Sequence, residues 1–389
     1  MFFLPNKNNQ DLLGAFSPSG QPLAVAMMIE TVGLGGAEMV VAQLAEALRA
    51  RGHRVEPVVP NGREGWLVEE LEANGFRCNR YDLRRAVDLG FSARLAAQLR
   101  ELDVDVVHSH EFVMAVYGAA AAKRLGVPHV ITMHGSQTMT ERYRRRAALR
   151  WAFRRSRATI AVSEDTRRHL ESSLGIRAGI VDVIPNGIPD RPGNRSAIRQ
   201  DLSVGPDEVL LLSVGSLSPR KAHVLLIEAL ALLEQRGEKL PWRLAIVGDG
   251  PERPLLEKKM QEAGLEKRIH LLGKRTDIPD LQAAADIFVL PSLWEGLPLA
   301  LLEGMFGGNA IVASNISGIP EAVEHGTHGL LTPPGDPVAL ADAIGTLLRN
   351  PDTRIRMAEA ARERARNSFT IDVMTSAYER LYGTGLQTL

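Results

Sequence analysis

The sequence predicts an α/β protein of two doubly wound, Rossmann-like domains that face each other across a cleft, and three observations support this. The chain has 389 residues, more than the ~250–300 at which a single core usually stops growing. Short β-branched apolar runs alternate with longer helical patterns, which is typical of right-handed βαβ units and parallel sheets. A stretch rich in proline and glycine, 183–196, interrupts the alternation and indicates a hinge.

The first series of elements begins at Leu23. A strand is predicted at 24–30, then a glycine-rich turn and a helix at 37–51 with apolar residues at helical spacing. Gly52 ends that helix, because glycine tolerates the left-handed conformation common after a last turn. Further strands are predicted from apolar runs at 54–59, 104–108, 128–133 and 158–162.

The second series has the same design without repeating the sequence of the first. Its strands are predicted at 209–215, 242–248, 268–273, 286–291 and 310–314. The helices between them are predicted at about 221–235, 251–263, 277–285 and 298–307. The tail is helical from Asp352, with a separate last helix at Phe369–Tyr382. We therefore expect an N-terminal extension (1–20), a first domain (21–187), a second domain (188–368) and a C-terminal helical segment (369–389).

Composition excludes several classes of protein. Lysine plus arginine and aspartate plus glutamate both number 46, so the net charge indicates no particular partner. Cys78 is the only cysteine, which excludes an internal disulfide and a cysteine-based zinc site and favours a reducing, cytoplasmic compartment. The N-terminus lacks the apolar core of a signal peptide. No run approaches the ~18 apolar residues of a membrane span, so we expect any membrane contact to be peripheral.

A glycine-rich turn, Gly33-Leu34-Gly35-Gly36, follows the first strand and opens the first helix. Glycines there let backbone amides approach a phosphate or a sugar, and a helix N-terminus favours negative charge. The dinucleotide fingerprint needs a third glycine where this chain has Glu38, which argues against an NAD site. The alternative is a purely structural turn, since such turns occur in many α/β domains.

Ser216, Arg220 and Lys221 follow the first strand of the second half. A lysine near the start of a helix is electrostatically unfavourable unless an anion lies there. We therefore interpret this segment as an anion site. The alternative is a pair of solvated surface cations.

The stretch Trp294–Leu299, followed by Glu303, is the most informative in the chain. Pro298 suits the first turn of a helix, so the amides near it are free to hold a phosphate. Glu303 lies in the second turn of an otherwise apolar helix, where an unpaired buried carboxylate is costly. Ribose hydroxyls would satisfy its two oxygens; the alternative is an ion pair with a neighbouring arginine.

The sequence His108-Ser109-His110 ends the strand predicted at 104–108. Because side chains alternate along a strand, His110 lies on the same side as His108 and Ser109 on the other. We expect His110 at a strand tip in the cleft, although a lone strand histidine is more often a satisfied core residue. His134 repeats the pattern. Neither a His/Asp/Glu triplet with metal spacing nor an acidic pair on a strand end is found, so we expect no metal site.

The segment Arg142–Arg157 carries eight arginines in sixteen residues together with three aromatic residues. No acidic residue interleaves for pairing along a helix. Anionic lipid or a phosphorylated acceptor fits the aromatic residues better than nucleic acid, because the rest of the chain offers no basic platform. The alternative is pairing with acidic residues elsewhere in the fold. The candidates for this acceptor or membrane side are Arg142, Arg144, Arg145, Arg146 and Trp151.

From about Leu23 to Tyr382 the chain resembles glycosyltransferase family 4, the large group of retaining enzymes with the GT-B fold. One matching string alone would be weak evidence, whereas the whole series in this order and spacing is specific. The matching strings are GGAE (35–38), HSHE (108–111), VSE (162–164), IPNGI (184–188), PRK (219–221), VGDGP (247–251), the E-x7-E pair Glu295/Glu303, GIPE (318–321) and GLLTPPGD (329–336).

The resemblance implies roles by position. It places Glu303 at the donor ribose, Glu295 near the donor sugar, Lys221 at the diphosphate and His110 next to the transferred sugar, so that His110, Lys221 and Glu295 are the catalytic candidates. The arginine of the family's basic pair falls on Ser216, a departure that Arg220 would have to compensate. The donor-binding candidates are Gly35, Gly36, Ser216, Arg220, Lys221, Lys274, Arg275, Glu295, Gly296, Leu297, Pro298, Leu299 and Glu303.

The resemblance also implies the function. We expect retaining, metal-independent transfer of a sugar from a UDP- or GDP-linked donor, without a cofactor, to a glycan or lipid-linked acceptor in surface polysaccharide or lipopolysaccharide assembly. The first domain would bind the acceptor, the second would bind the donor, and the last helix would cross back to the first. The expected location is the cytoplasm, with peripheral contact at the inner face of the plasma membrane.

Three alternatives share parts of this pattern. A nucleotide-sugar 2-epimerase of the same fold binds the donor without transferring it. An NAD(P) oxidoreductase is disfavoured by Glu38, and a scaffold without catalysis is disfavoured by the intact E-x7-E pair and Lys221.

Overall fold

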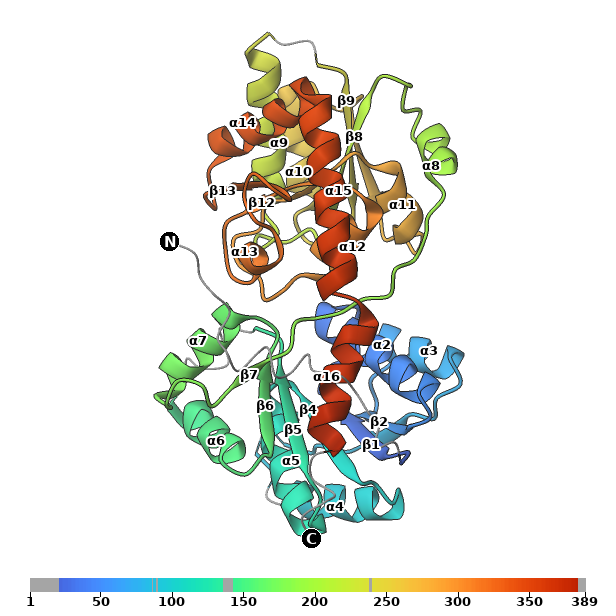
Figure 1. Cartoon of the computed structure of the whole chain (residues 1–389), viewed down its shortest axis with the longest axis vertical. Coiled ribbons are helices and arrows are strands. Elements are labelled where there is room, and N and C mark those ends of the chain that lie inside the picture. Colours follow the sequence, from blue (N-terminus) through green and yellow to red (C-terminus); the bar gives the residue numbers. More distant parts are fainter. Residues whose placement is uncertain (1–20, 86, 89, 136–142, 238–239, 384–389) are drawn as a thin grey trace.

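The computed structural model describes residues 21–85, 87–88, 90–135, 143–237 and 240–383. Two parallel sheets, each covered by helices, are stacked along the long axis of the molecule (Figure 1). The predicted N-terminal extension and Arg142 lie outside the described residues, as does the end of the C-terminal segment.

The N-terminal sheet has seven strands in the order β3-β2-β1-β4-β5-β6-β7, and all its pairings are parallel. The order reverses between β1 and β4, the position at which such sheets bind ligands. The strands are β1 Ala24–Met28, β2 Arg54–Pro60, β3 Asn79–Tyr81, β4 Val106–His110, β5 His129–Met133, β6 Ala158–Ala161 and β7 Asp182–Val183. The helices are α2 Gly36–Ala50, α3 Trp66–Ala73, α4 Phe91–Glu101, α5 Glu111–Leu125, α6 Tyr143–Phe153 and α7 Glu164–Leu174.

The C-terminal sheet has six parallel strands in the order β10-β9-β8-β11-β12-β13, with its reversal between β8 and β11. The strands are β8 Val209–Val214, β9 Trp242–Val247, β10 Ile269–Gly273, β11 Ile287–Leu290, β12 Ala310–Ser314 and β13 Gly329–Thr332. The helices are α8 Arg195–Asp201, α9 His223–Gln235, α10 Arg253–Ala263, α11 Ile278–Ala284, α12 Leu299–Gly307, α13 Ile319–Ala322 and α14 Pro337–Arg349. The predicted fold class is therefore confirmed.

Every strand predicted from the sequence is present, whereas three short strands are additional. These are β3, β7 and β13, which lie at sheet edges and have only three, two and four residues. Their short sequences carry no apolar run long enough to predict a strand. The helix predicted from residue 221 begins at His223, because Lys221 still belongs to a turn in which its amide donates to Ser218 O at 3.0 Å.

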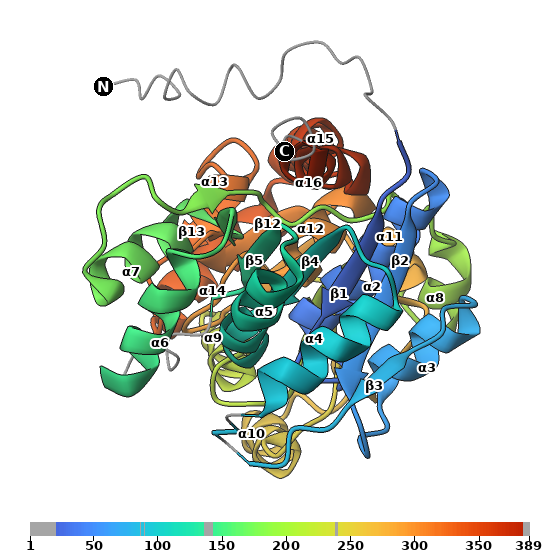
Figure 2. The same ribbon diagram turned by 90° about the horizontal axis from the view of Figure 1, so that it is seen from below.

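The chain crosses between the sheets twice, at residues 184–194 and at the junction of the last two helices, and the two crossings pair with each other. Ile188 N donates to Phe369 O, and Ile371 N donates to Ile188 O, each at 2.9 Å. Helix α15 (Pro351–Ser368) packs on α12 and β12, and α16 (Ile371–Gly383) packs on α2 (Figure 1). The last helix therefore returns to the N-terminal sheet, on the side opposite to α4 and α5 (Figure 2).

Candidate active site between the two sheets

The carboxyl ends of the two sheets meet at glycines that leave no room for side chains. A Cβ on Gly296, which follows β11, would lie 2.5 Å from His134 O after β5. On the same boundary Asn186 Nδ2 donates to Leu297 O at 2.8 Å. Glu321 accepts from the first amides of α7, at 2.8 Å from Glu164 N and 2.9 Å from Asp165 N. The strand ends that hold the candidate residues are thus brought together.

Lys221 and Glu295 form a buried ion pair at the ends of β8 and β11. Lys221 Nζ lies 2.7 Å from Glu295 Oε1, and each residue is only 7% exposed. Arg220 completes the cluster, with its guanidinium 3.1 Å from Glu295 Oε2 and 4.8 Å from the centre of the Trp294 ring. Two cations around one carboxylate leave a local excess of positive charge, which suits an anionic ligand.

The loop after β8 is polar but carries no cation at its first position. Ser216 Oγ lies 3.1 Å from Ser218 Oγ near the surface. A Cβ on Gly215 would lie 3.0 Å from Lys221 Cε, so the lysine stem lies against the end of the strand. Lys221 is thereby held at the sheet reversal, where Ser216 supplies no positive charge.

Lys274 and Arg275 follow β10. Lys274 is exposed. Arg275 forms a 2.6 Å ion pair with Asp277 and a longer one, 3.7 Å, with Asp201 at the end of α8. The charge of Arg275 is therefore already engaged by two carboxylates.

Helix α12 presents its N-terminus directly after the Gly296 contact. The first amides that donate within the helix are those of Leu301 and Leu302, both to Pro298 O. The amides of Leu299 and Ala300 come before them and belong to the unsatisfied group that opens any helix. Pro298 is the N-cap rather than a residue of the first turn. These amides and the helix dipole favour a phosphate.

Glu303 lies in the second turn of α12 and is half-buried. It forms no hydrogen bond or ion pair with another described residue, so the alternative of a neighbouring arginine partner finds no support there. Burial raises the pKa of its carboxyl to about 7, against the opposing attraction of Arg191. A carboxyl in this state is available to hydroxyl donors.

His110 belongs to a buried polar ladder on the N-terminal side. His110 Nδ1 lies 3.0 Å from His134 Nε2, and its ring packs against that of His108 with centroids 4.2 Å apart and the planes tilted by 37°. His108 in turn lies 2.6 Å from Tyr382 Oη on α16 and 2.8 Å from Thr132 Oγ1. Burial holds the pKa of His110 well below its usual range, so this ring is neutral. His110 Nε2 is buried and has no hydrogen-bond partner in the part of the chain that the structure describes.

Sequence reasoning assigned no role to several charged residues near His110. Glu30 follows β1, and Glu111 directly follows His110. Glu30 Oε2 accepts from Val113 N at 2.6 Å. Both residues lie at the β1–β4 reversal. Their positions directly after predicted strands were the sequence signal that could have identified them as site residues.

The arginine-rich segment forms α6 at the surface. Among the described residues, no arginine of this helix forms an ion pair. Arg145 lies 5.4 Å from the Phe112 ring and is exposed, as is Arg144. Arg150 Nε donates to Leu174 O, and Trp151 lies under Arg155 at 4.9 Å. The predicted alternative of acidic partners is therefore not seen within the described part of the chain.

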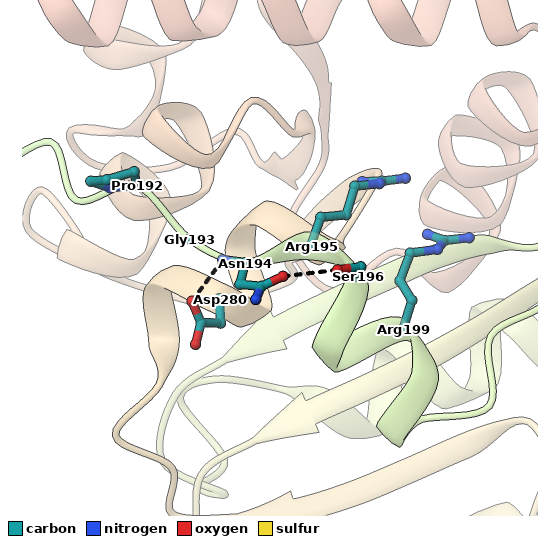
Figure 3. A pocket seen from close by; sticks show the side chains of 7 residues that line it. All are labelled: Pro192, Gly193, Asn194, Arg195, Ser196, Arg199 and Asp280. Carbon is teal, nitrogen blue, oxygen red and sulfur yellow. Dashed lines mark hydrogen bonds between the residues drawn. The ribbon is translucent and has the colours of Figure 1, made fainter.

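An open pocket of about 710 Å³ lies away from these residues, where the linker meets α8 and α11 (Figure 3). Its polar groups are largely engaged locally: Asn194 N donates to Asp280 Oδ1 at 2.7 Å, and Ser196 Oγ donates to Asn194 Oδ1 at 3.0 Å. The pocket contains none of the candidate site residues.

No group of three or more His, Cys, Asp or Glu side chains in the described ranges is arranged to hold a metal ion. Likewise, none of the described helices is both long and apolar enough to cross a bilayer.

Two family models match the chain, one over most of the N-terminal sheet and the other over the C-terminal sheet. The model for glycosyltransferase family 4 matches residues 34–191, and the model for glycosyl transferases group 1 matches residues 194–364.

Curated relatives cover most of the chain. A D-inositol 3-phosphate glycosyltransferase of Frankia alni is 30% identical over 85% of this chain and 90% of its own length. The N-acetyl-alpha-D-glucosaminyl L-malate synthase of Bacillus anthracis is 25% identical over 90% of this chain and 94% of its own. Among solved structures, Anabaena HepE in complex with UDP has a TM-score of 0.81 and 25% identity, over 93% of this chain and 100% of its own.

Proposed function

The chain belongs to glycosyltransferase family 4 and has its GT-B fold, and we propose that it moves a sugar from a UDP- or GDP-linked donor to a glycan or lipid-linked acceptor. The observation that carries this proposal is the buried Lys221–Glu295 ion pair at the ends of β8 and β11, beside the N-terminus of α12. HepE has been solved in complex with UDP-glucose, which supports a UDP-linked donor.

In this scheme the donor diphosphate binds Lys221 and the opening amides of α12. Negative charge grows on the diphosphate as its bond to the sugar breaks, and a fixed cation and helix N-terminus stabilise that charge. Glu295 holds the ammonium at 2.7 Å before the donor arrives, so little reorganisation is needed. Glu303, once ionised, accepts hydrogen bonds from the ribose hydroxyls.

We further propose that transfer retains the anomeric configuration. The bond from the sugar to the diphosphate breaks, the acceptor oxygen attacks from the same face, and its proton passes to the departing diphosphate. Support comes from Glu295, the carboxylate at the cation cluster, which is already committed to Lys221 and Arg220 and is poorly placed as a nucleophile. The neutral His110 ring is suited to contact the transferred sugar.

The proposed chemistry is independent of metal ions, because Lys221 and α12 supply the positive charge. A chelator is therefore expected to leave activity intact. Activity lost to chelator and restored by magnesium or manganese would contradict this part of the proposal.

We propose surface polysaccharide or glycolipid assembly as the setting, with the protein in the cytoplasm and peripherally bound at the membrane. A relative from Escherichia coli, 30% identical over 73% of this chain, is a UDP-Gal:alpha-D-GlcNAc-diphosphoundecaprenol alpha-1,3-galactosyltransferase. The exposed arginines of α6 would contact anionic lipid.

The decisive experiment is a donor panel of UDP-glucose, UDP-galactose, UDP-N-acetylglucosamine and GDP-mannose, scored for release of nucleoside diphosphate with and without acceptor extract. A glycosyltransferase releases diphosphate faster with acceptor. An epimerase converts the donor to an isomer without acceptor, and that outcome would overturn the proposal.

A further inference from the structure

Glu111 opens α5 with a backbone conformation that side chains rarely adopt. Its φ is +66°, in the left-handed region that favours glycine. The residue follows His110, the last residue of β4 at the sheet reversal. Strain of this kind persists where the surrounding structure enforces it, and it is concentrated at functional sites.

The Glu111 carboxyl is buried and only half satisfied. The residue is 8% exposed, and its Oε1 accepts from His134 N at 3.2 Å. The other oxygen, Oε2, is buried and has no partner among the described residues, and the same is true of Nε2 of the adjacent His110. Two orphaned polar atoms on consecutive residues are costly unless a ligand supplies their hydrogen bonds.

The neighbouring groups define the ligand chemistry. The β1–β4 register pairs Met28 with Ser109, Glu30 and Glu111 follow the ends of these two adjacent strands, and the charge of Glu30 acts on Glu111. Burial raises the pKa of both carboxyls, that of Glu111 to about 8, and Glu38 adds to the effect. A partly neutral carboxyl can both donate and accept hydrogen bonds, which matches a hydroxyl group.

A cationic ligand would be repelled by Arg145 and Arg63, whose positive charges act on Glu30. A metal ion would need a third suitable ligand, and the described residues form no such group. An anionic ligand would be repelled by the carboxyl groups of Glu30 and Glu111 whenever these are ionised. A neutral hydroxyl is the remaining chemistry that satisfies both orphaned atoms.

We propose that Glu111 Oε2 hydrogen-bonds the attacking hydroxyl of the acceptor, with His110 Nε2 beside it, and that this end of the acceptor is an uncharged polyol. The inference rests on the proposed function, because it places the acceptor hydroxyl next to the sugar that His110 contacts. The strained turn at Glu111 is what directs the carboxyl from the end of β4 toward that position.

The test compares Glu111→Gly and Glu111→Gln with the wild type. Glycine keeps the positive φ without strain and removes the carboxyl, whereas glutamine keeps a side chain of the same size. Asp182→Asn on β7 is the matched control, since it removes a carboxyl whose pKa is also raised by burial, at the edge of the same sheet.

Each protein is incubated with the donor from which the wild type releases most diphosphate, in molar glycerol as a surrogate polyol. The products are glycosyl-glycerol and free sugar from hydrolysis. Glu111→Gly is expected to lower the ratio of glycosyl-glycerol to free sugar by about tenfold or more, as for loss of a strong hydrogen bond. The affinity for UDP, measured by calorimetry, should be unchanged, and Asp182→Asn should behave as the wild type.

The melting temperature separates a functional from a structural role. Glu111→Gly relieves strain, so its melting temperature should equal or exceed that of the wild type while its transfer is impaired. An unchanged product ratio in both Glu111 variants would overturn the inference, as would a wild type that hydrolyses donor without glycosylating glycerol. A wild type that releases no diphosphate from any donor would instead contradict the proposed function.

Discussion

The two sides of the candidate site differ in how completely their charges are satisfied. On the C-terminal side, Lys221, Arg220 and Glu295 form a closed ionic cluster within 3.1 Å. On the N-terminal side, His110 Nε2 and Glu111 Oε2 are buried without partners, and the arginines of α6 lack ion pairs within the described residues. We infer that the cation cluster of the donor side is organised in advance, whereas Glu303 and the proposed acceptor side are completed by a ligand.

The relatives are consistent with this division. Their names share glycosyl transfer but differ in acceptor: malate, inositol phosphate and a diphospholipid-linked sugar.

Replacing Lys221 by alanine should have the largest effect, on the donor side. We expect kcat to fall by about 10²–10³-fold, with a smaller change in donor affinity, because the lost charge acts mainly on the departing diphosphate. Steady-state kinetics of diphosphate release measure both. Arg220→Ala is the matched control and should have less effect, since Arg220 is more exposed than Lys221. A Lys221→Ala effect confined to KM would show that the lysine only binds the ground state.

Ser216→Arg complements this experiment. The variant restores the arginine of the family's basic pair, and Ser216 lies near the surface, so we expect a folded protein. Misfolding would count against the placement of this residue at the diphosphate.

Glu303→Ala should weaken donor binding by at least about tenfold, because charge-assisted hydrogen bonds contribute ~1.5–3 kcal/mol each. The binding should also depend on pH. Burial raises the pKa of Glu303 to about 7, so the carboxyl is neutral below that pH and ionised above it. Affinity for UDP-glucose should therefore rise from pH 6 to pH 8 in the wild type. Calorimetry of Glu303→Gln is the control, and an unaltered pH dependence in that variant would remove the ribose assignment.

Tyr382→Phe tests whether α16 supports the acceptor side. The hydroxyl lies 2.6 Å from His108 Nδ1 in a fully buried setting, and its loss should lower the free energy of unfolding by about 1–3 kcal/mol. Denaturant unfolding measures this. Tyr143→Phe is the control at an exposed position, 73% accessible, and should change nothing. Equal stability of all three proteins would mean that α16 is held by apolar packing alone.

The local sequence pattern predicted those candidate site residues whose position depends on a neighbouring strand or helix. The Gly296–Leu299 turn, Lys221 and Glu303 each follow a buried strand, and strand ends gather ligands in doubly wound sheets. Pairings over long separations could not be read in this way. Tyr382 reaches His108 across 274 positions, and Glu321 caps α7 across 157. The strained backbone of Glu111 is likewise a product of tertiary packing, since no sequence pattern predicts a positive φ at a glutamate.

The smallest effect on donor chemistry is expected from the surface arginines of α6. Each arginine near an anionic bilayer contributes roughly 1 kcal/mol of attraction, and aromatic residues can insert at the headgroup level. Arg144 in the first turn of α6 and Arg154 directly after its last residue are both exposed, and neither forms an ion pair with another described residue.

Wild-type protein should therefore sediment with anionic liposomes at low salt, and not at high salt or with neutral lipid, because exposed charges are screened by salt. Replacing Arg144 and Arg154 with serine should reduce sedimentation markedly while leaving UDP affinity unchanged. Arg145 is retained in this variant because it acts on Glu30 and a change there would disturb the acceptor side. If the wild type stays in the supernatant under all conditions, α6 is a solvated face, and the unsatisfied charges of the acceptor side serve a soluble acceptor instead.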